Sequence, residues 1–373
     1  MVSRSLREEK MMSALLENKL LQLLLLLLLL SSVILFYSFA GSSESVFSET
    51  KSFKAVVHEK EKRADNVPLD QAAKHNEEFN NDFHILMMFT NVDQRPVLEK
   101  KLKNMLESLF EHAKFDAEQI LHLHFVCDDK SKDIAKETVF THSDHPDVHL
   151  EAHFHSVDNF AKQIYPIVKN MQEHFGNHNY FKDAIFFLSI AMHRILPTNI
   201  HRIVQLDLDL KINANIRDLW NEFDYFRHEN LFGLARENQP VYRHTFWKYR
   251  KENPGTKVGN PPPDGITGFN SGVILLNLDL IRDSRFYNEF LDNSKVEKLV
   301  KKYYFKGHLG DQDFFTLMNI EHPELFHILD CTWNRQLCQW WKTHGYQDIF
   351  DRYFMCDGDV KIWHANCDTP FPE

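Results

Sequence analysis

The segment Ile203-Val-Gln-Leu-Asp-Leu-Asp-Leu-Lys-Ile212 constrains this chain more than any other. Apolar and polar residues alternate along it, and this period of two predicts a β-strand with the carboxylates of Asp207 and Asp209 on the same face. Two adjacent anions repel each other unless a cation or hydrogen-bond donors hold them, and oxygen ligands suit Mg²⁺ or Mn²⁺. An isolated segment of this kind is also typical of an amphipathic strand with one face in water. The segment therefore predicts either a divalent-metal site or a solvated strand face.

Strand and helix patterns alternate around this segment. We expect strands at residues 83–89, 121–126 and 149–155, and helices at 96–112, 131–138, 160–175 and 183–196. This alternation predicts an α/β fold with a mixed, mainly parallel sheet flanked by helices. Ligands of such sheets lie beyond the carboxyl ends of the strands, where Asp207 and Asp209 are expected. The Pro- and Gly-rich segment 252–268 is either a functional loop or a surface decoration.

The N-terminal region contains an uncharged stretch, residues 20–40, with eight consecutive leucines. As a helix it would span about 30 Å, the thickness of a membrane core. It is longer than the apolar core of a signal peptide, although Ser38-Phe39-Ala40 resembles a cleavage site. The basic residues before it and the large region after it favour a cytosolic N-terminus. We therefore expect a cytosolic tail (1–19), a transmembrane signal anchor (20–40), a flexible lumenal stem (41–80) and a lumenal catalytic domain (81–373).

Charge and cysteine usage narrow the function classes. The net charge of −10, with Lys and Arg scattered, argues against a nucleic-acid-binding surface. Four of the five cysteines lie close together near the C-terminus and predict two disulfides formed in an oxidising compartment. A zinc site is the alternative, but the spacing lacks a CxxC pair. Of the three pairings that four cysteines allow, we favour Cys331–Cys356 and Cys338–Cys367.

Three further segments carry residues suited to binding. In the segment 269–277, a polar turn precedes a buried strand, and Asn270 and Ser271 offer hydrogen-bond donors while Gly272 allows close backbone approach. The segment 308–315 is a turn followed by a helix start, with Asp311 as a natural N-cap. His364 ends a short strand and would complete a mixed oxygen and nitrogen metal site. Each segment also has an ordinary structural interpretation: a loop-to-strand junction, a capped helix and a structural histidine.

In this order, the motifs DxD, FNSGVxLLN, GDQD and KIxH resemble those of the family-8 glycosyltransferases, which are retaining enzymes of the GT-A fold. The resemblance runs from about residue 83 to the C-terminus. It implies a nucleotide-sugar donor and an Mn²⁺ ion, with Mg²⁺ as an alternative, held by Asp207, Asp209 and His364. Segments 239–247, 307–315 and 329–338 further resemble family members that transfer xylose from UDP-xylose. Those enzymes form an α-1,3 linkage to the xylose of xylose-glucose on Notch-type EGF repeats. This implies a single-pass type II protein of the endoplasmic reticulum membrane, with the Golgi as an alternative.

The resemblance also implies roles for individual residues. Gln312 stands where a covalent mechanism would need a carboxylate nucleophile, and an amide is a poor nucleophile. We therefore expect a same-face, ion-pair-like displacement in which Gln312 orients the sugar or stabilises the cationic centre. Many family members have a glycine and a diphosphate-binding lysine after the ligand histidine, whereas this chain has Ala365 and Asn366. The expected donor-binding residues are Thr90, Asp207, Asn270, Ser271, Gln312 and Asn366, and the expected acceptor-binding residues are His244, His308, Leu309, Trp340 and Trp341.

Three other functions are alternatives to this interpretation. The donor sugar rests on a few pocket contacts, so a glucosyl- or galactosyltransferase of the same family is an alternative. A catalytically inactive glycan- or protein-binding module is another, although the intact Asp207, Asp209 and His364 argue against it. A metal-dependent phosphohydrolase usually needs more ligands than these three, often for two metals.

Overall fold

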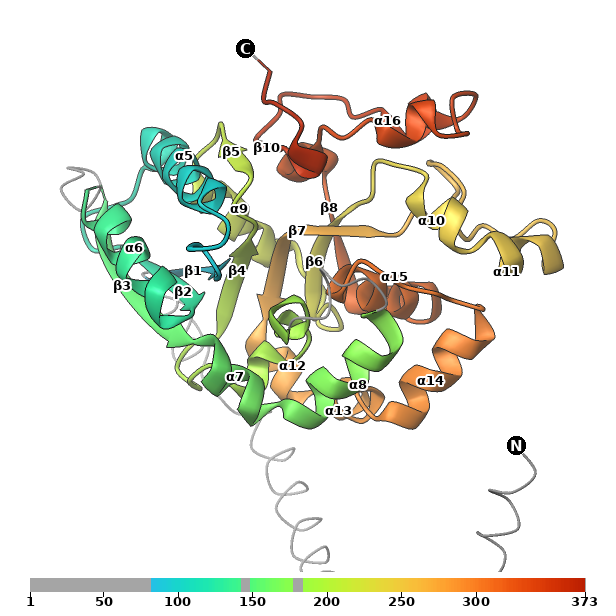
Figure 1. Cartoon of the computed structure of the whole chain (residues 1–373), viewed down its shortest axis with the longest axis horizontal. Coiled ribbons are helices and arrows are strands. Elements are labelled where there is room, and N and C mark those ends of the chain that lie inside the picture. Colours follow the sequence, from blue (N-terminus) through green and yellow to red (C-terminus); the bar gives the residue numbers. More distant parts are fainter. Residues whose placement is uncertain (1–81, 142–147, 177–183, 373) are drawn as a thin grey trace, which may run out of the picture. The chain divides into compact units, whose positions relative to one another are not determined.

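A mixed seven-stranded sheet organises the chain (Figure 1). The computed structural model describes residues 82–141, 148–176 and 184–372. The order of the sheet is β3-β2-β1-β4-β7-β6-β8, in which β7 is antiparallel to β4 and β6 and the other neighbouring strands are parallel. The strands are β1 (Asp82–Phe89), β2 (Ile120–Cys127), β3 (His149–Ser156), β4 (Arg202–Leu206), β6 (Phe232–Arg236), β7 (Phe269–Asn277) and β8 (Phe326–Leu329). The prediction of a mixed, mainly parallel α/β sheet is confirmed.

Helices cover both faces of this sheet. Successive side chains of a strand point to opposite faces, so Ile85 and Met87 join one core cluster while Leu86 joins the other. The first face packs against α5 (Val97–His112), α6 (Asp129–Phe140) and α9 (Ile216–Trp220). The second packs against α7 (Val157–Gln163), α8 (Tyr165–Phe175), α10 (Val241–Thr245), α12 (Leu278–Asp283), α13 (Arg285–Phe290), α14 (Asn293–Lys302) and α15 (Asp311–Glu321). Two short helices, α11 (Trp247–Glu252) and α16 (Phe350–Phe354), lie outside these layers.

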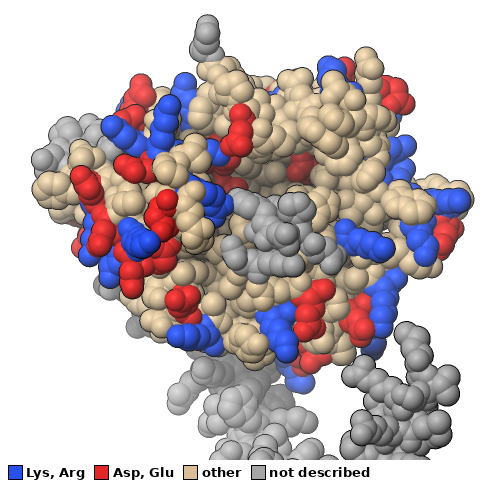
Figure 2. Space-filling model, viewed as in Figure 1, with Lys and Arg blue, Asp and Glu red and all other residues tan. Residues whose placement is uncertain are grey.

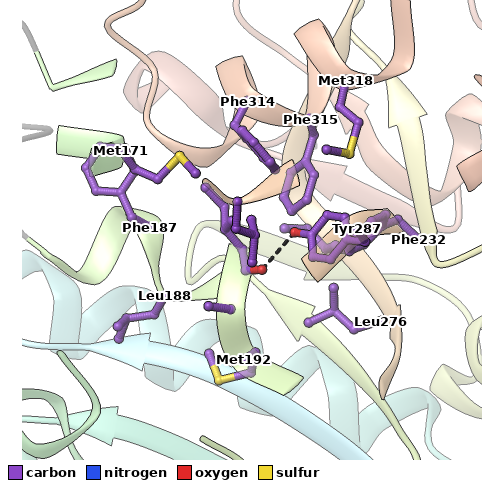
Figure 3. Packing of buried hydrophobic residues seen from close by; sticks show 14 of the residues in the cluster. Met171, Phe187, Leu188, Met192, Phe232, Leu276, Tyr287, Phe314, Phe315 and Met318 are labelled. Carbon is purple, nitrogen blue, oxygen red and sulfur yellow. Dashed lines mark hydrogen bonds between the residues drawn. The ribbon is translucent and has the colours of Figure 1, made fainter. Parts of the chain in front are cut away.

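The second core cluster is rich in aromatic side chains and surrounds α15 (Figure 3). Phe314 and Phe315 pack close to Phe232 and Tyr287, and the Tyr287 hydroxyl donates a hydrogen bond of 2.7 Å to the carbonyl of Ile190. Residues 311–319 of α15 are all buried. Helix α15 is therefore a core element, and the packing around it sets the position of its first turn.

A second, three-stranded sheet lies at the carboxyl edge of the large one. It consists of β5 (Leu210–Ile212), β10 (Ile362–His364) and β9 (Arg335–Gln336), with β10 in the middle. Strand β10 runs antiparallel to β5, and His364 pairs with Leu210. This pairing places the end of the chain beside the segment that contains Asp207 and Asp209.

Four expectations from the sequence are wrong in detail. The strand over 203–212 is broken, because β4 ends at Leu206, Asp207 is in neither strand, and residues 208–209 form a bend before β5. The helix over 160–175 is two helices that meet at Ile164, next to Pro166 in the first turn of α8. Residues 184–194 form 3₁₀ turns instead of an α-helix. Asp311 is not the N-cap of its helix: Gly310, with φ of 68°, takes that position.

The predicted tail (1–19), signal anchor (20–40) and stem (41–80) lie outside the described residues. Among the helices that the structure describes, none is both long enough and apolar enough to cross a membrane.

Two disulfides hold the C-terminal segment, with the pairing favoured from the sequence. Cys331 is bonded to Cys356 and Cys338 to Cys367, across sequence separations of 25 and 29 residues. Cys127 is free and buried in β2. Cross-links over loops of this length stabilise a fold by about 3–4 kcal/mol each, largely by restricting the unfolded chain.

Peptide mapping without reductant should therefore find these two bridges and a single free thiol at Cys127. Replacing Cys331 and Cys356 together by Ser should lower the free energy of unfolding by about 3 kcal/mol, because the unfolded chain regains loop entropy. Chemical denaturation of the wild type and the variant measures this difference. A different pairing, or four reactive C-terminal thiols in the folded protein, would contradict the structure.

Candidate active site

A cavity of about 480 Å³ opens at the carboxyl edge of the large sheet. The face shown in Figure 2 is hollowed, and acidic atoms are visible inside the hollow. The lining comes from the ends of β1, β4 and β6, the start of β7, the first turn of α15 and the C-terminal segment. This is the location at which open α/β sheets bind their ligands, and its volume suits a small molecule.

Asp207, Asp209 and His364 converge in this cavity. The Nε2 atom of His364 lies 3.7 Å from a carboxylate oxygen of Asp207 and 3.4 Å from one of Asp209. The bend after β4 brings both carboxylates to the same point, although they are no longer in one strand. Backbone hydrogen bonds hold the bend, since the Asp207 N–H donates to the Gly272 carbonyl and the Ala365 N–H donates to the Asp209 carbonyl.

His364 is fixed in orientation by its neighbours. Its Nδ1 atom lies 2.9 Å from the side-chain oxygen of Asn334, so the Nδ1–H donates there and Nε2 faces the carboxylates. A bond of this kind to the second ring nitrogen is typical of histidines that bind metals. A Cβ atom on Gly272 would lie 2.4 Å from the His364 ring. Glycine at this position is thus required for the approach of β7, as its place in the motif predicted.

The charges of the cluster depend on one another. Burial and the neighbouring Asp209 raise the pKa of Asp207 to about 7, even though 49% of the Asp207 side chain is open to the cavity. Burial alone would raise the pKa of Asp209, but the hydrogen bond with His364 outweighs burial and holds this pKa well below its usual range. Burial lowers the pKa of His364, and the hydrogen bond and charge of Asp209 outweigh that effect and raise it. Two carboxylates and one neutral imidazole fit a divalent cation, which would take over the role of the charged histidine.

Gln312 is held at both ends of its side-chain amide. Its oxygen accepts a hydrogen bond of 3.2 Å from the Ser271 N–H, and its nitrogen donates one of 3.3 Å to Glu237. The side chain of Asn270 also donates to Glu237, at 3.2 Å. These contacts leave the Gln312 amide with one orientation at the cavity wall.

The structure brings most of the predicted site residues together. Besides the metal-type cluster and Gln312, those that line the cavity are Thr90, Asn270, Ser271, Leu309, Trp340, Trp341 and Asn366. His244 lies outside the lining, with its ring 5.0 Å from that of Trp341. His308 is also outside it, and its backbone N–H donates to the carboxylate of Asp313.

Sequence reasoning missed four charged residues of the cavity lining, which among the described residues are Arg95, Lys101, Glu237 and Asp311. Glu237 follows β6 directly and is buried, and burial raises its pKa to about 7. Asp311 forms a hydrogen bond with the Ser189 hydroxyl, and burial raises its pKa to about 6. Lys101 of α5 reaches the cavity, where its amino group lies 3.3 Å from the carboxylate of Asp209. Glu237 was open to prediction, since it follows a strand at the carboxyl edge as Asp207 does, whereas Lys101 is brought in by tertiary packing.

Comparison with known proteins agrees with the geometry. No protein-family model matches the chain. Xyloside xylosyltransferase 1 of Mus musculus is 53% identical over 296 residues, which are 78% of this chain and 75% of the mouse protein. The Homo sapiens protein of the same name is 52% identical over the same length. The crystal structure of the mouse protein without ligands superposes with a TM-score of 0.74, covering 78% of this chain and 100% of the mouse chain.

More distant relatives are also glycosyltransferases by name. Xylosyl- and glucuronyltransferase LARGE2 of Mus musculus is 28% identical over 246 residues, which are 66% of this chain and 31% of that protein. The GT-A-type fold, the polar cavity at its carboxyl edge and these relatives define a glycosyltransferase. More specifically, the chain belongs to the xyloside xylosyltransferase 1 family.

The buried Glu237 predicts a pH dependence of stability. Its pKa is about 7 in the folded protein against the ordinary value of 4.5, so between these values the unfolded state releases a proton that the folded state keeps. Stability therefore falls as pH rises through this window, by on the order of 3 kcal/mol from this group. Glu237→Gln removes the ionisable group, so the thermal midpoint of the variant should rise relative to the wild type between pH 5 and 7.5.

The exposed Glu118 offers a matched control, and Glu118→Gln should leave the pH profile unchanged. Parallel profiles for Glu237→Gln and the wild type would show that Glu237 does not titrate in this window.

Proposed function

We propose that this protein transfers xylose from UDP-xylose, in α-1,3 linkage, to the xylose of a xylose-glucose O-glycan on Notch-type EGF repeats. The observation that carries the proposal is the cluster of Asp207, Asp209 and His364, placed in the cavity of a chain 53% identical to a xyloside xylosyltransferase. The name of that relative supports xylose as the donor sugar and a xyloside as the acceptor. The segments that resemble EGF-modifying xylosyltransferases support the choice of the protein acceptor.

Asp207, Asp209 and His364 would hold Mn²⁺, with Mg²⁺ as the alternative. The imidazole favours Mn²⁺ over Mg²⁺, which prefers oxygen ligands alone. When bound, the cation would stabilise the negative charge that develops on the leaving UDP diphosphate.

The amino group of Lys101 would provide a second positive charge for the diphosphate. This chain lacks the lysine that many family-8 enzymes carry after the ligand histidine, and it has Asn366 instead. The side-chain oxygen of Asn366 accepts hydrogen bonds from the N–H groups of Leu337 and Cys338, so Asn366 supports the loop that carries His364. Lys101 lies at the cavity beside Asp209 and Asp368, from a different element of the fold. We assign the contact with the diphosphate to Lys101.

Gln312 would act on the transferred sugar. Its amide is fixed by Ser271 and Glu237, so it can present a dipole to the sugar without reorganisation, which is the arrangement that stabilises a developing charge most effectively. An amide is a poor nucleophile, and we therefore propose a same-face displacement through an ion-pair-like state. In this mechanism an oxygen of the departing UDP accepts the proton of the acceptor hydroxyl.

The acceptor would approach from the C-terminal side of the cavity. The side chain of Trp340 is 51% exposed and stacks on His344, with ring centroids 3.6 Å apart. Trp340 and Trp341 both line the cavity. Trp340 is exposed and Trp341 is partly buried against the core. An exposed aromatic side chain that is anchored in this way beside a sugar site suits contact with a glycosylated protein domain. The two disulfides support a lumenal location, and we propose the endoplasmic reticulum membrane with a type II topology, the Golgi being the alternative.

Transfer assays test this function directly. The purified chain is incubated with Mn²⁺, labelled UDP-xylose, UDP-glucose or UDP-galactose, and a folded EGF repeat carrying either glucose or xylose-glucose. Only UDP-xylose with the xylose-glucose repeat should give product, and linkage analysis should show an α-1,3 bond. Asp209→Asn should reduce the rate by about two orders of magnitude or more, because it removes a charged metal ligand. Transfer from another donor would replace the proposed substrate, and donor binding without turnover would favour a binding module.

Kinetics of variants separate the roles of Gln312 and Lys101. Gln312→Ala should lower kcat by about one to two orders of magnitude and leave the KM for donor nearly unchanged, because it removes a group that acts mainly in the transition state. Lys101→Met should raise the donor KM by about tenfold, because it removes a charge-assisted contact with the diphosphate.

The exposed Gln163 and Lys103 provide matched controls, and Gln163→Ala and Lys103→Met should behave as the wild type. Near-normal kcat in Gln312→Ala would return this residue to a structural role. An unchanged donor KM in Lys101→Met would leave the diphosphate to other groups.

A further inference from the structure

A row of histidines covers one face of the sheet, away from the proposed active site. Strands β1, β2 and β3 pair in parallel, and every second residue of a strand points to this face. Several of the residues that point to it are histidines. The rings contact one another across the strands, with centroids 4.6–5.3 Å apart in neighbouring pairs. The histidine row consists of His84 in β1, His122 and His124 in β2, and His153 and His155 in β3.

Three side chains of this face point their ligand atoms at one another. The Nδ1 of His122 lies 3.0 Å from the Nε2 of His153 and 3.5 Å from a carboxylate oxygen of Glu151, and the Nε2 of His153 lies 3.8 Å from that same oxygen. A tetrahedral zinc ion with bonds of about 2.0–2.1 Å holds its ligand atoms about 3.3 Å apart. The three distances in the structure lie around this value, so one ion fits with small adjustments of the side chains.

The second nitrogen of His122 already has the partner that a metal-bound histidine needs. Its Nε2 lies 3.3 Å from a carboxylate oxygen of Asp82, at the start of β1. An Nε2–H donated to Asp82 leaves a free electron pair on Nδ1, which is the atom that faces His153 and Glu151. A carboxylate behind a ligand histidine fixes the ring and raises its basicity in many zinc proteins.

Burial and exposure also suit a zinc site. His122 is largely buried, whereas the side chains of His153 and Glu151 are 38% and 55% exposed. The site thus has one rigid ligand and two accessible ones. Because β3 is the edge strand of the sheet, an ion can enter from solvent (Figure 1).

We propose that His122, Glu151 and His153 form a second metal site, which binds Zn²⁺ with water as the fourth ligand and joins β2 to the edge strand β3. Without the ion, an N–H···N hydrogen bond joins His153 to His122. When Zn²⁺ binds, the His153 proton moves from Nε2 to Nδ1, so the ring stays neutral. Two imidazoles and one carboxylate select Zn²⁺ over Mn²⁺, whereas the Asp207 cluster has the opposite balance of oxygen and nitrogen ligands.

Zinc titration of the full chain tests the proposal. Isothermal titration calorimetry is run with saturating Mn²⁺ and UDP, so that the Asp207 cluster is occupied, and Asp209→Asn is titrated in parallel. Wild type and Asp209→Asn should both bind one Zn²⁺. His153→Gln should weaken binding by more than about 100-fold, and Asp82→Asn, which removes only the positioning group, by about 10- to 100-fold.

His149→Gln is the matched control, because His149 is an exposed histidine of the same strand and should not affect Zn²⁺ binding. Zinc should raise the thermal midpoint of the wild type but not that of His153→Gln, since a ligand that binds only the folded state stabilises it. Circular dichroism and retained Mn²⁺-dependent UDP binding establish that His153→Gln is folded. Absence of Zn²⁺ binding by the wild type, or equal binding by His153→Gln, would overturn the proposal and leave the histidine row with a structural role.

Discussion

The repulsion between Asp207 and Asp209 is the constraint around which the rest of the site is built. Two like charges at about 4 Å cost about 4 kcal/mol at the effective dielectric constant of a protein surface. The fold keeps them together through the bend between β4 and β5 and places the imidazole of His364 within 4 Å of both. A divalent cation in that position would stabilise the two carboxylates more strongly than the imidazole of His364 does. The cluster is therefore organised for a cation before any ion binds.

The third member of the cluster comes from the far end of the chain, and several devices hold it there. Strand β10 pairs with β5, the Cys338–Cys367 disulfide closes the loop behind it, and Asn366 binds the backbone at Leu337 and Cys338. The absence of a side chain at Gly272 lets the His364 ring pack against β7. Cross-linking of the C-terminal segment thus serves the geometry of the site as well as stability.

The sequence predicts those features of the site that depend on local residue patterns. The sequence shows the alternation through Asp207 and Asp209, the polar turn at Asn270 and the cysteine spacing. The structure places residues from each of these features at one edge of the sheet. The break after Leu206 is not visible, because the alternation continues through it and the pairing of β5 with β10 is a tertiary effect. Asp311 failed as an N-cap for the same reason, since its partner Ser189 lies 122 residues away. The split at Pro166, in contrast, was open to prediction.

The direct test of the account is the location of the metal. Crystals grown with Mn²⁺ and UDP, measured at the manganese absorption edge, should show an anomalous peak within bonding distance of Asp207, Asp209 and the Nε2 of His364, bridged to the diphosphate. Such a peak would show that the cluster is a cation site and that the donor binds through it. UDP bound with no ion between these three side chains, or an ion at another location only, would contradict the central claim.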